Sequence, residues 1–375
     1  MPCGQGRRGL RRKPGGRVMR HFFFGKACGL CYTVRMEFEH ALLNWYRENR
    51  RDLPWRRTRD PYAVWISEIM LQQTRVNAVI PYYESFLTAF PNVTALAEAD
   101  DDRLMKLWQG LGYYSRAKNL KRAAIETLER FGNTLPGSYR ELLTLPGIGS
   151  YTAGAIASIA YNERVPAVDG NVLRVMARIR DDARDVMAPK TREAVFSELL
   201  SDFPADAGTF NQALMELGAM VCVPNGAPLC AACPVKDVCR ARQNGTIALR
   251  PVKSKKAKRT IEPVTVFALF DGERFLVRKR RDEGLLAGLY ELPNVSGTLN
   301  GDEAAAYLDA LGARPIGEIR QYERKHIFTH REWHMRVYAC AVQAGDLSGY
   351  VWYDGTQSLP TAFGICLPDR KEKRP

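Results

Sequence analysis

The segment from Glu141 to Arg178 constrains the fold most, because it predicts a helix, a tight turn, a second helix, a loop and a third helix. Apolar residues recur at helical spacing on both sides of the turn at residues 146–149. Gly147 and Gly149 let two backbones approach closely. The N–H groups at the start of the second helix would suit a phosphate oxygen. An ordinary helical hairpin capped by glycine is the alternative, and the turn alone favours it.

Asp169 and Asn171 stand at the start of the third predicted helix. Most Asp residues in that position are N-caps, so capping is the simplest role for Asp169. The Ala- and Gly-rich second helix allows close packing and leads within one short loop to Asp169. This continuity makes the whole segment a candidate functional region.

Glu68 lies among apolar side chains in a helix predicted at residues 65–74. A carboxyl group in apolar surroundings has a raised pKa and can serve as a general acid near neutral pH. The alternative is a partly exposed Glu on an amphipathic helix. The helix ends at Leu71, Gln72 and Gln73, whose apolar and amide side chains are suited to filling a gap in a stack of bases.

Other aromatic and basic residues are candidates for contact with nucleic acid. Trp55 lies between arginines in residues 51–56 and could stack on a base, or it could be a packing anchor. Tyr113 follows two nearby glycines and is a candidate to intercalate. Arg116 begins a basic helical face that could contact phosphate, or simply be solvated.

Four cysteines, Cys222, Cys230, Cys233 and Cys239, cluster with the spacing C-x7-C-x2-C-x5-C, and Arg240 follows them. Four thiolates without a nearby His fit either a structural zinc or an iron–sulfur cluster. The spacing by itself slightly favours zinc. The other cysteines are scattered, which indicates a reducing compartment.

The length of 375 residues predicts more than one domain, and no apolar run is long enough to span a membrane. The net charge is +14, but residues 1–35 hold nine Lys and Arg and no acid, which leaves +5 for the rest. Because an amphipathic helical pattern begins at Met36, residues 1–35 are expected to be a disordered or non-native extension outside the fold. The remaining charge favours polyanions modestly.

The periodicity divides the chain into a helical half at residues 36–248 and an α+β half at residues 263–368, joined by a basic linker at 249–262 and followed by a tail at 369–375. The linker could lie along DNA. In the second half we expect a hairpin around Asp271 and Gly272, a helix at 302–311, and strands near 317–322 and 333–342. A tight turn at Phe328, Thr329 and His330 is suited to reading a base.

The segments LPGIGSYTAGA and VDGNVLRV resemble the helix-hairpin-helix and catalytic-aspartate segments of base-excision DNA glycosylases related to endonuclease III. From about Met36 onward the chain resembles the MutY family of adenine DNA glycosylases. The resemblance implies a mainly α catalytic half with a four-cysteine loop and an α+β, degenerate Nudix-like C-terminal domain. Residues 283–293 resemble the Nudix glycine loop, but the acid-rich metal-binding helix of active Nudix hydrolases is missing, which argues against nucleotide hydrolysis.

The family implies a reaction in which adenine mispaired with 8-oxoguanine or guanine is flipped out of double-stranded DNA and hydrolysed off, leaving an abasic site. By this resemblance Glu68 protonates a ring nitrogen of adenine, and Asp169 stabilises or traps the sugar cation. Tyr151 and Asn171 assist by hydrogen bonding. Tyr151 stands where bifunctional relatives have a Lys that forms a Schiff base, so a monofunctional glycosylase is expected. A lyase of the endonuclease III type and a catalytically idle DNA-binding or redox-signalling protein are the alternatives.

The resemblance also assigns contacts with substrate and with the DNA backbone. The adenine-pocket positions are Arg51, Leu53, Trp55, Arg56 and Gln212. The wedge and lesion-reading positions are Leu71, Gln73, Tyr113, Phe328, Thr329 and His330, with Thr329 where the family commonly has Ser. The DNA-backbone positions are Gly147, Gly149, Arg116 and Arg240.

The family usually holds a 4Fe-4S cluster with the spacing C-x6-C-x2-C-x5-C. Here one extra residue lies between Cys222 and Cys230, where a Pro-Asn-Gly turn at 224–226 can loop out an insertion. The resemblance therefore favours one 4Fe-4S cluster on the segment 222–239, with zinc as the alternative. We expect a monomer in the bacterial cytoplasm, associated with the nucleoid through DNA and not with a membrane.

Overall fold

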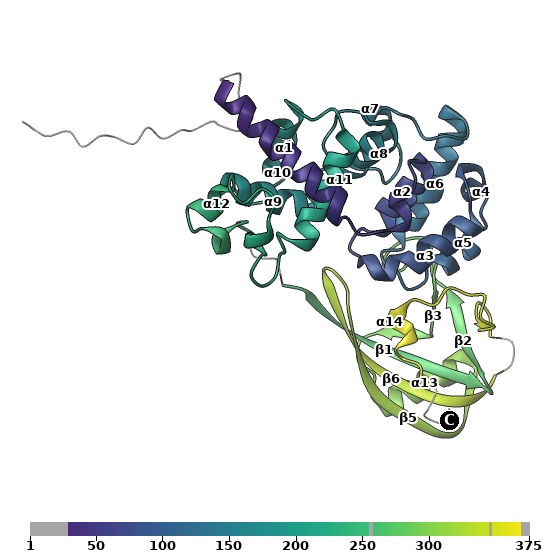
Figure 1. Cartoon of the computed structure of the whole chain (residues 1–375). Coiled ribbons are helices and arrows are strands. Elements are labelled where there is room, and N and C mark those ends of the chain that lie inside the picture. Colours follow the sequence, from purple (N-terminus) through teal and green to yellow (C-terminus); the bar gives the residue numbers. More distant parts are fainter. Residues whose placement is uncertain (1–28, 255–257, 345–346, 369–375) are drawn as a thin grey trace, which may run out of the picture. The chain divides into compact units, whose positions relative to one another are not determined.

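The computed structural model describes residues 29–254, 258–344 and 347–368 (Figure 1). The chain forms two compact units, one from the residues up to Arg50 together with Val168–Val252, the other from Arg51–Ala167 together with the residues from Lys253 onward. This division cuts through the predicted helical half, and the domain boundaries predicted at 248 and 263 stay predictions. Each unit is described by itself.

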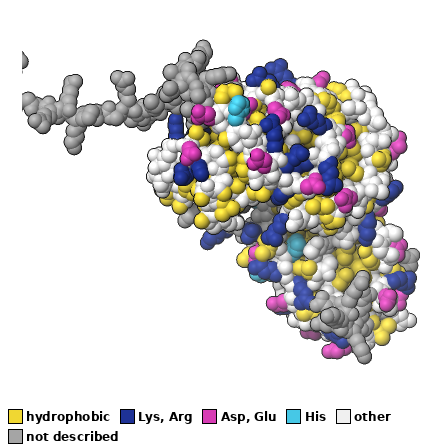
Figure 2. Space-filling view, viewed as in Figure 1, with side chains coloured by type: hydrophobic (Ala, Val, Ile, Leu, Met, Phe, Trp, Pro, Cys, Tyr) yellow, Lys and Arg dark blue, Asp and Glu magenta, His cyan; other side chains and the backbone are white. Residues whose placement is uncertain are grey.

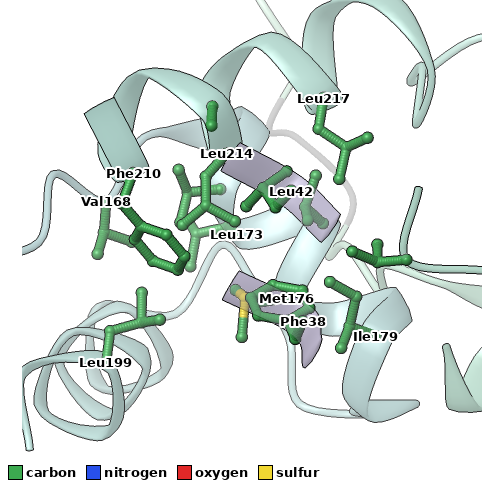
Figure 3. Close-up of a cluster of buried hydrophobic side chains, with 14 of the residues drawn as sticks. Phe38, Leu42, Val168, Leu173, Met176, Ile179, Leu199, Phe210, Leu214 and Leu217 are labelled. Atoms are coloured by element: carbon green, nitrogen blue, oxygen red, sulfur yellow. The ribbon is translucent and has the colours of Figure 1, made fainter. Parts of the chain in front are cut away.

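The first unit is helical. Its elements are α1 (Gly29–Asn49), α9 (Gly170–Arg180), α10 (Pro189–Leu200), α11 (Ala207–Met220), η2 (Cys230–Ala232), α12 (Arg240–Gln243) and η3 (Ile247–Leu249). Its core joins Phe38 and Leu42 of α1 to Met176 of α9 and to Phe210 and Leu214 of α11 (Figure 3). The rings of Phe38 and Phe210 meet edge to face at 6.1 Å. Burial of these apolar faces stabilises the unit.

Helix α1 begins at Gly29, before the start predicted at Met36. The apolar pattern at Phe38 and Leu42 marks the packed part of the helix correctly, and the backbone continues as helix toward the N-terminus to Gly29. The backbone at 29–35 is therefore helical, and the assignment of residues 1–35 to an extension outside the fold stays a prediction. Residues 1–28 lie outside the described part of the chain.

The first part of the second unit is helical. They are η1 (Pro54–Arg56), α2 (Pro61–Met70), α3 (Val76–Ala89), α4 (Val93–Ala97), α5 (Asp101–Trp108), α6 (Ser115–Phe131), α7 (Tyr139–Leu142) and α8 (Ser150–Tyr161). Asp60 caps α2 by accepting from the backbone N–H groups of Tyr62 and Ala63, and Pro61 occupies the first helical position. Every residue of α2 from Tyr62 to Met70 is buried, as expected of a helix packed on all sides.

The predicted helical hairpin is confirmed as α7, a turn and α8. Gly147 has a φ of +76°, which favours glycine, and a Cβ there would lie 2.7 Å from Cβ of Asn119. Close packing of the Ala- and Gly-rich helix is also confirmed, because a Cβ on Gly154 would lie 2.4 Å from the carbonyl oxygen of Pro166.

The second unit also contains the sheet of the C-terminal half (Figure 1). Its elements are β1 (Thr260–Asp271), β2 (Arg274–Lys279), β3 (Tyr290–Glu291), β4 (Asn294–Ser296), α13 (Gly301–Leu311), β5 (Ala313–Ile327), β6 (Arg331–Ala344), β7 (Val351–Trp352) and α14 (Thr361–Gly364). The strand order is β3-β2-β1-β6-β5, with β4 on β1 and β7 on β2. The predicted hairpin, helix and later strands are confirmed, and β5 and β6 are longer than predicted.

Alternating residues of β1 explain why both faces of this sheet are covered. Val266 and Ala268 belong to the core that includes Phe363 of α14, whereas Phe267 belongs to the core that includes Leu308 of α13. Successive side chains of a strand point to opposite faces, so β1 is buried on both faces from Val264 to Phe270. The sheet is thereby fixed in register, and with it the β5–β6 turn at residues 328–330.

The structure describes both ends of the linker predicted at 249–262, which stays a prediction. Nε of Arg250 lies 2.9 Å from Oδ1 of Asp181, and the N–H of Val186 donates to the carbonyl of Val252 at 3.1 Å, so residues up to 252 pack against the first unit. At the other end, β1 already begins at Thr260. Within the described residues, no helix combines the length and apolarity needed to cross a bilayer.

Replacing Gly154 by Ala should lower the free energy of unfolding by about 1–3 kcal/mol, because the added methyl group meets backbone that cannot rotate away. Gly301→Ala is the matched control, since a Cβ there meets nothing within 4 Å, and it should change stability by less than about 0.5 kcal/mol. Urea denaturation followed by circular dichroism checks both. Equal effects of the two substitutions would contradict the close packing of α8.

Candidate active site

Glu68 is buried on α2, with 6% of its surface exposed. The hydroxyl of Tyr151 on α8 donates a hydrogen bond to its Oε2. A second link runs from the turn after α2 to α8, where Nε2 of Gln72 donates to Oγ1 of Thr152 at 3.3 Å. The predicted apolar surroundings of Glu68 are thus confirmed, and the alternative of a partly exposed Glu is wrong.

Asp169 lies in the other unit and is the N-cap of α9. Its Oδ1 accepts from the backbone N–H of Val172 at 2.7 Å, and its Oδ2 accepts from Nδ2 of Asn171 at 2.6 Å. The capping role is confirmed, but capping occupies only one oxygen. Burial raises the pKa of Asp169, while the hydrogen bonds from Val172 and Asn171 and the charge of Arg174 oppose that rise.

Arg174 connects Asn171 to the start of the cysteine segment. Its Nη2 donates to Oδ1 of Asn171 and to the carbonyl of Gly218, each at 2.8 Å, and its Nε donates to the carbonyl of Cys222 at 2.7 Å. A Cβ on Gly218 would lie 2.6 Å from Cβ of Asn171, so glycine allows α11 to approach. Burial lowers the pKa of Arg174. Arg174 was not among the predicted site residues. Arg174 and Arg178 stand four residues apart among apolar residues of the same helix, which was a signal that both arginines are buried.

The four clustered cysteines line one cavity together with apolar side chains of α9 and α11. Nη1 of Arg178 donates to Sγ of Cys222 at 3.2 Å, and Sγ of Cys239 lies 3.5 Å from the carbonyl oxygen of Arg178. Burial and the neighbouring cysteines raise the pKa of Cys233 to about 11. In the part of the chain that is described, no three His, Cys, Asp or Glu side chains are arranged to hold a single metal ion. Four thiols around an apolar cavity, with a guanidinium at one sulfur, fit a cluster with four cysteine ligands.

Two predicted wedge residues meet in the second unit. The hydroxyl of Tyr113 donates to Oε1 of Gln73 at 2.5 Å and lies 2.9 Å from Oγ1 of Thr329. Gln73 and Tyr113 have φ angles of 58° and 48°, in the left-handed region that non-glycine residues rarely adopt. The structure therefore brings together the wedge and the turn predicted to read the base. Leu71 ends α2 nearby in sequence as its C-cap.

The β5–β6 turn is anchored by Phe328. Its ring packs edge to face on Trp333 at 5.0 Å and on His326 at 4.6 Å. Thr329 and His330 are exposed. The turn thus exposes a hydroxyl and an imidazole while the packed ring of Phe328 holds its backbone in place, as a loop that reads a base requires.

The predicted adenine-pocket residues are divided between the units. Leu53 and Trp55 are buried, and Trp55 packs edge to face on Tyr83 at 5.4 Å, so the packing role left open by the sequence is confirmed. Nη1 of Arg56 donates to the carbonyl of Arg51 at 3.0 Å. In the other unit, Oε1 of Gln212 accepts from the hydroxyl of Tyr46 at 3.1 Å. Contact of these residues with adenine stays a prediction.

The predicted phosphate contact of Arg116 is wrong. Arg116 is 8% exposed, and its guanidinium donates to backbone carbonyl oxygens inside the protein, so it is not a surface cation. Gly149 is the N-cap of α8 and has no side-chain cap, which agrees with an anion at this helix end. The backbone contacts of Gly147, Gly149 and Arg240 stay predictions. Lys and Arg side chains spread over the visible surface among Asp and Glu, in keeping with a modest positive excess (Figure 2).

Comparison with known proteins places both halves. Residues 66–201 match the HhH-GPD superfamily of base excision DNA repair proteins, and residues 265–371 match the NUDIX domain. The adenine DNA glycosylase of Homo sapiens is 36% identical over 370 residues, covering 82% of this chain and 67% of that protein. The adenine DNA glycosylase of Buchnera aphidicola subsp. Schizaphis graminum is 32% identical over 350 residues, covering 90% of this chain and 97% of that protein. The structure of a thermostable thymine-DNA glycosylase superposes with a TM-score of 0.51 at 27% identity, covering 57% of this chain and 98% of that one.

Arg174→Leu should lower the free energy of unfolding by about 3 kcal/mol, because each buried acceptor left without a donor costs roughly 1–3 kcal/mol. Arg184→Leu is the control, since Arg184 is exposed and pairs with Asp182 and Glu198, and ion pairs of an exposed side chain contribute about 0–1 kcal/mol. Chemical denaturation of both variants measures the difference. An Arg174→Leu variant as stable as the control would show that Arg174 does not join Asn171 to the cysteine segment.

Proposed function

The chain belongs to the adenine DNA glycosylases of the helix-hairpin-helix base-excision repair superfamily, and we propose that it is a monofunctional glycosylase acting on adenine mispaired with 8-oxoguanine or guanine. The reaction would replace the N-glycosidic bond of adenine by a bond to water and leave an abasic site in double-stranded DNA. The observation that carries the proposal is the buried Glu68 carboxyl held by the hydroxyl of Tyr151.

Glu68 is the proposed general acid. Protonation of a ring nitrogen makes adenine a neutral leaving group, so the bond between its nitrogen and the sugar carbon can break. The hydrogen bond from Tyr151 fixes one oxygen of the carboxyl group. Since a general acid must reach its acceptor within hydrogen-bonding distance, this orientation supports the role.

Asp169 is the proposed stabiliser of the sugar as positive charge develops on it. Val172 and Asn171 orient its two oxygens, so little reorganisation would be needed in the transition state. Burial reduces the screening of its charge by water. The same burial raises the pKa of Asp169, which means that the ionised carboxylate is less stable than it would be in water. This is the energetic cost of placing a negative charge beside the sugar.

Tyr151 supports hydrolysis over strand cleavage. A lyase of this superfamily needs an amine to form a Schiff base with the opened sugar. A phenol hydroxyl cannot form that adduct, and here it is engaged by Glu68. We therefore assign water as the final nucleophile.

The mispair preference is proposed for the turn at residues 328–330 and the wedge. Thr329 contacts Tyr113, and Tyr113 contacts Gln73, so a base opposite adenine could be sensed by both elements. Cys222, Cys230, Cys233 and Cys239 would hold a 4Fe-4S cluster, which when bound would cross-link the segment 222–239 and add charge beside it. Visible absorption and iron analysis of fresh protein test this assignment, and stoichiometric zinc in a colourless sample would overturn it.

The function is tested with a duplex that carries adenine opposite 8-oxoguanine. We expect a strand break that depends on alkali, loss of nearly all product in Asp169→Asn, and no stable adduct with borohydride. A break without alkali together with a trapped adduct would indicate a lyase. Absence of any break would refute the glycosylase activity.

Because the pKa of Asp169 is raised, the single-turnover rate should fall on acidification at a higher pH than an ordinary Asp would give. The carboxylate is the active form, so the rate is retained above this raised pKa and lost below it. Asn171→Ala removes a hydrogen bond that lowers the pKa, and it should move the acidic limb to still higher pH. A limb that stays in place or moves to lower pH in Asn171→Ala would contradict the role of Asp169.

Thr329→Val should reduce the preference for 8-oxoguanine over guanine about three- to tenfold, the value of one neutral hydrogen bond. Valine keeps the shape of threonine and removes the hydroxyl that lies against Tyr113. Thr329→Ser keeps the hydroxyl and should retain the preference. Excision rates on the two mispairs decide the matter, and full preference in Thr329→Val would exclude a sensing role for the hydroxyl.

A further inference from the structure

Arg116 joins two turns that are distant in sequence and that precede the wedge residues. It lies in the first turn of α6 and is buried. Its Nη1 donates to the carbonyl oxygens of Ile69 at 2.6 Å, Met70 at 3.0 Å and Gln72 at 2.9 Å. The carbonyls of Ile69 and Met70 lie at the C-terminal end of α2, where helix carbonyls lack partners within the helix, and Gln72 lies in the turn that follows.

The other terminal nitrogen of Arg116 holds the second turn. Its Nη2 donates to the carbonyl oxygens of Leu111 and Gly112, each at 3.1 Å. The guanidinium carbon also lies 5.2 Å from the ring centre of Trp108 and 5.6 Å from that of Tyr113. One planar group therefore fixes both turns and faces the ring of Tyr113.

The residues that follow these carbonyls are strained. Gln73 comes directly after Gln72, and Tyr113 directly after Gly112, and both have left-handed φ angles. Such a conformation persists only where the surroundings enforce it. Two of the carbonyls bound by Arg116, those of Gln72 and Gly112, belong to the peptide groups that enter the two strained residues, so Arg116 is placed to enforce both conformations.

The strained conformations have one visible result, which is that the side chains of Gln73 and Tyr113 meet at 2.5 Å. Without these contacts of Arg116, which together act as a clamp on the two turns, relaxation of either turn would redirect the side chain of Gln73 or Tyr113. A lysine could keep the charge but not the fork that reaches both turns. Burial lowers the pKa of Arg116 to about 10, which leaves it charged at neutral pH.

We propose that Arg116 is a positioning residue for base extrusion, holding Gln73 and Tyr113 as a preformed wedge that fills the space left by the flipped adenine. This inference rests on the proposed glycosylase function. It assigns Arg116 neither a contact with DNA nor a part in breaking the bond. Its effect is therefore on the extrusion step and not on the chemistry.

The test compares two substrates in the full-length protein. One carries adenine opposite 8-oxoguanine in intact duplex, and the other carries the same adenine opposite a one-nucleotide gap, where unstacking costs less. On the intact duplex, Arg116→Lys and Arg116→Met should lower the single-turnover rate at least tenfold relative to the wild type. On the gapped duplex, the factor by which they lower the rate should be at least ten times smaller. Arg130→Met, which removes an exposed arginine from the far end of α6, should match the wild type on both.

General damage to the fold would lower both rates by the same factor, so a deficit of equal size on both substrates overturns the proposal, as does full activity on the intact duplex. A second arm replaces the target adenine by 2-aminopurine and measures the initial change of fluorescence at saturating protein, which reports unstacking before excision. We expect at least a threefold smaller rise for Arg116→Lys than for wild type, and an equal rise would overturn the clamp. If the wild type excises neither substrate, the glycosylase function fails, and the fluorescence arm still decides the role of Arg116.

Discussion

Buried guanidinium groups hold the loops on which the candidate chemistry depends. A buried cation is costly unless its N–H groups find acceptors, and helix ends offer carbonyl oxygens that need donors. Arg116, Arg174 and Arg178 each satisfy both needs at once. Each joins segments that are far apart in the sequence. The contacts of these arginines with backbone carbonyl oxygens therefore help to set the positions of the candidate functional side chains.

The dependence is clearest around Asp169. Its carboxylate is desolvated, which raises its pKa, and its oxygens are aimed by Val172 and Asn171. Asn171 is held in turn by Arg174, which also binds the carbonyl of Cys222. A charge poised for a cationic sugar is thus tied to the loop that would carry the cluster. Stability of the cysteine segment and orientation of the carboxylate are linked by one side chain.

Much of this could be predicted from the sequence. Hydrophobic periodicity located the helical and α+β halves, and the Gly-rich turn with Asp169 located the candidate catalytic segment. Glu68 was predicted to be buried because its neighbours on α2 are apolar, and it is. These predictions succeeded because burial and turn geometry can be predicted from patterns within short stretches of sequence.

Arginines account for the main error, and long-range contacts for what was missed. Arg116 was assigned to phosphate because arginines are usually exposed, and nothing local shows that its partners are carbonyls on another helix. The contact of Tyr113 with Thr329 joins residues 216 positions apart, which no periodicity can reveal. The start of α1 at Gly29 was missed because the predicted start rested on the apolar pattern from Met36 onward.

The central claim is that this chain extrudes adenine and not the base opposite to it. A crystal structure of Asp169→Asn bound to a duplex with adenine opposite 8-oxoguanine tests it most directly. We expect adenine to lie outside the base stack with its ring against Glu68. We expect the side chains of Gln73 and Tyr113 to lie inside the duplex, and 8-oxoguanine to lie beside Thr329. Adenine still stacked in an undistorted duplex, or 8-oxoguanine extruded in its place, would contradict it.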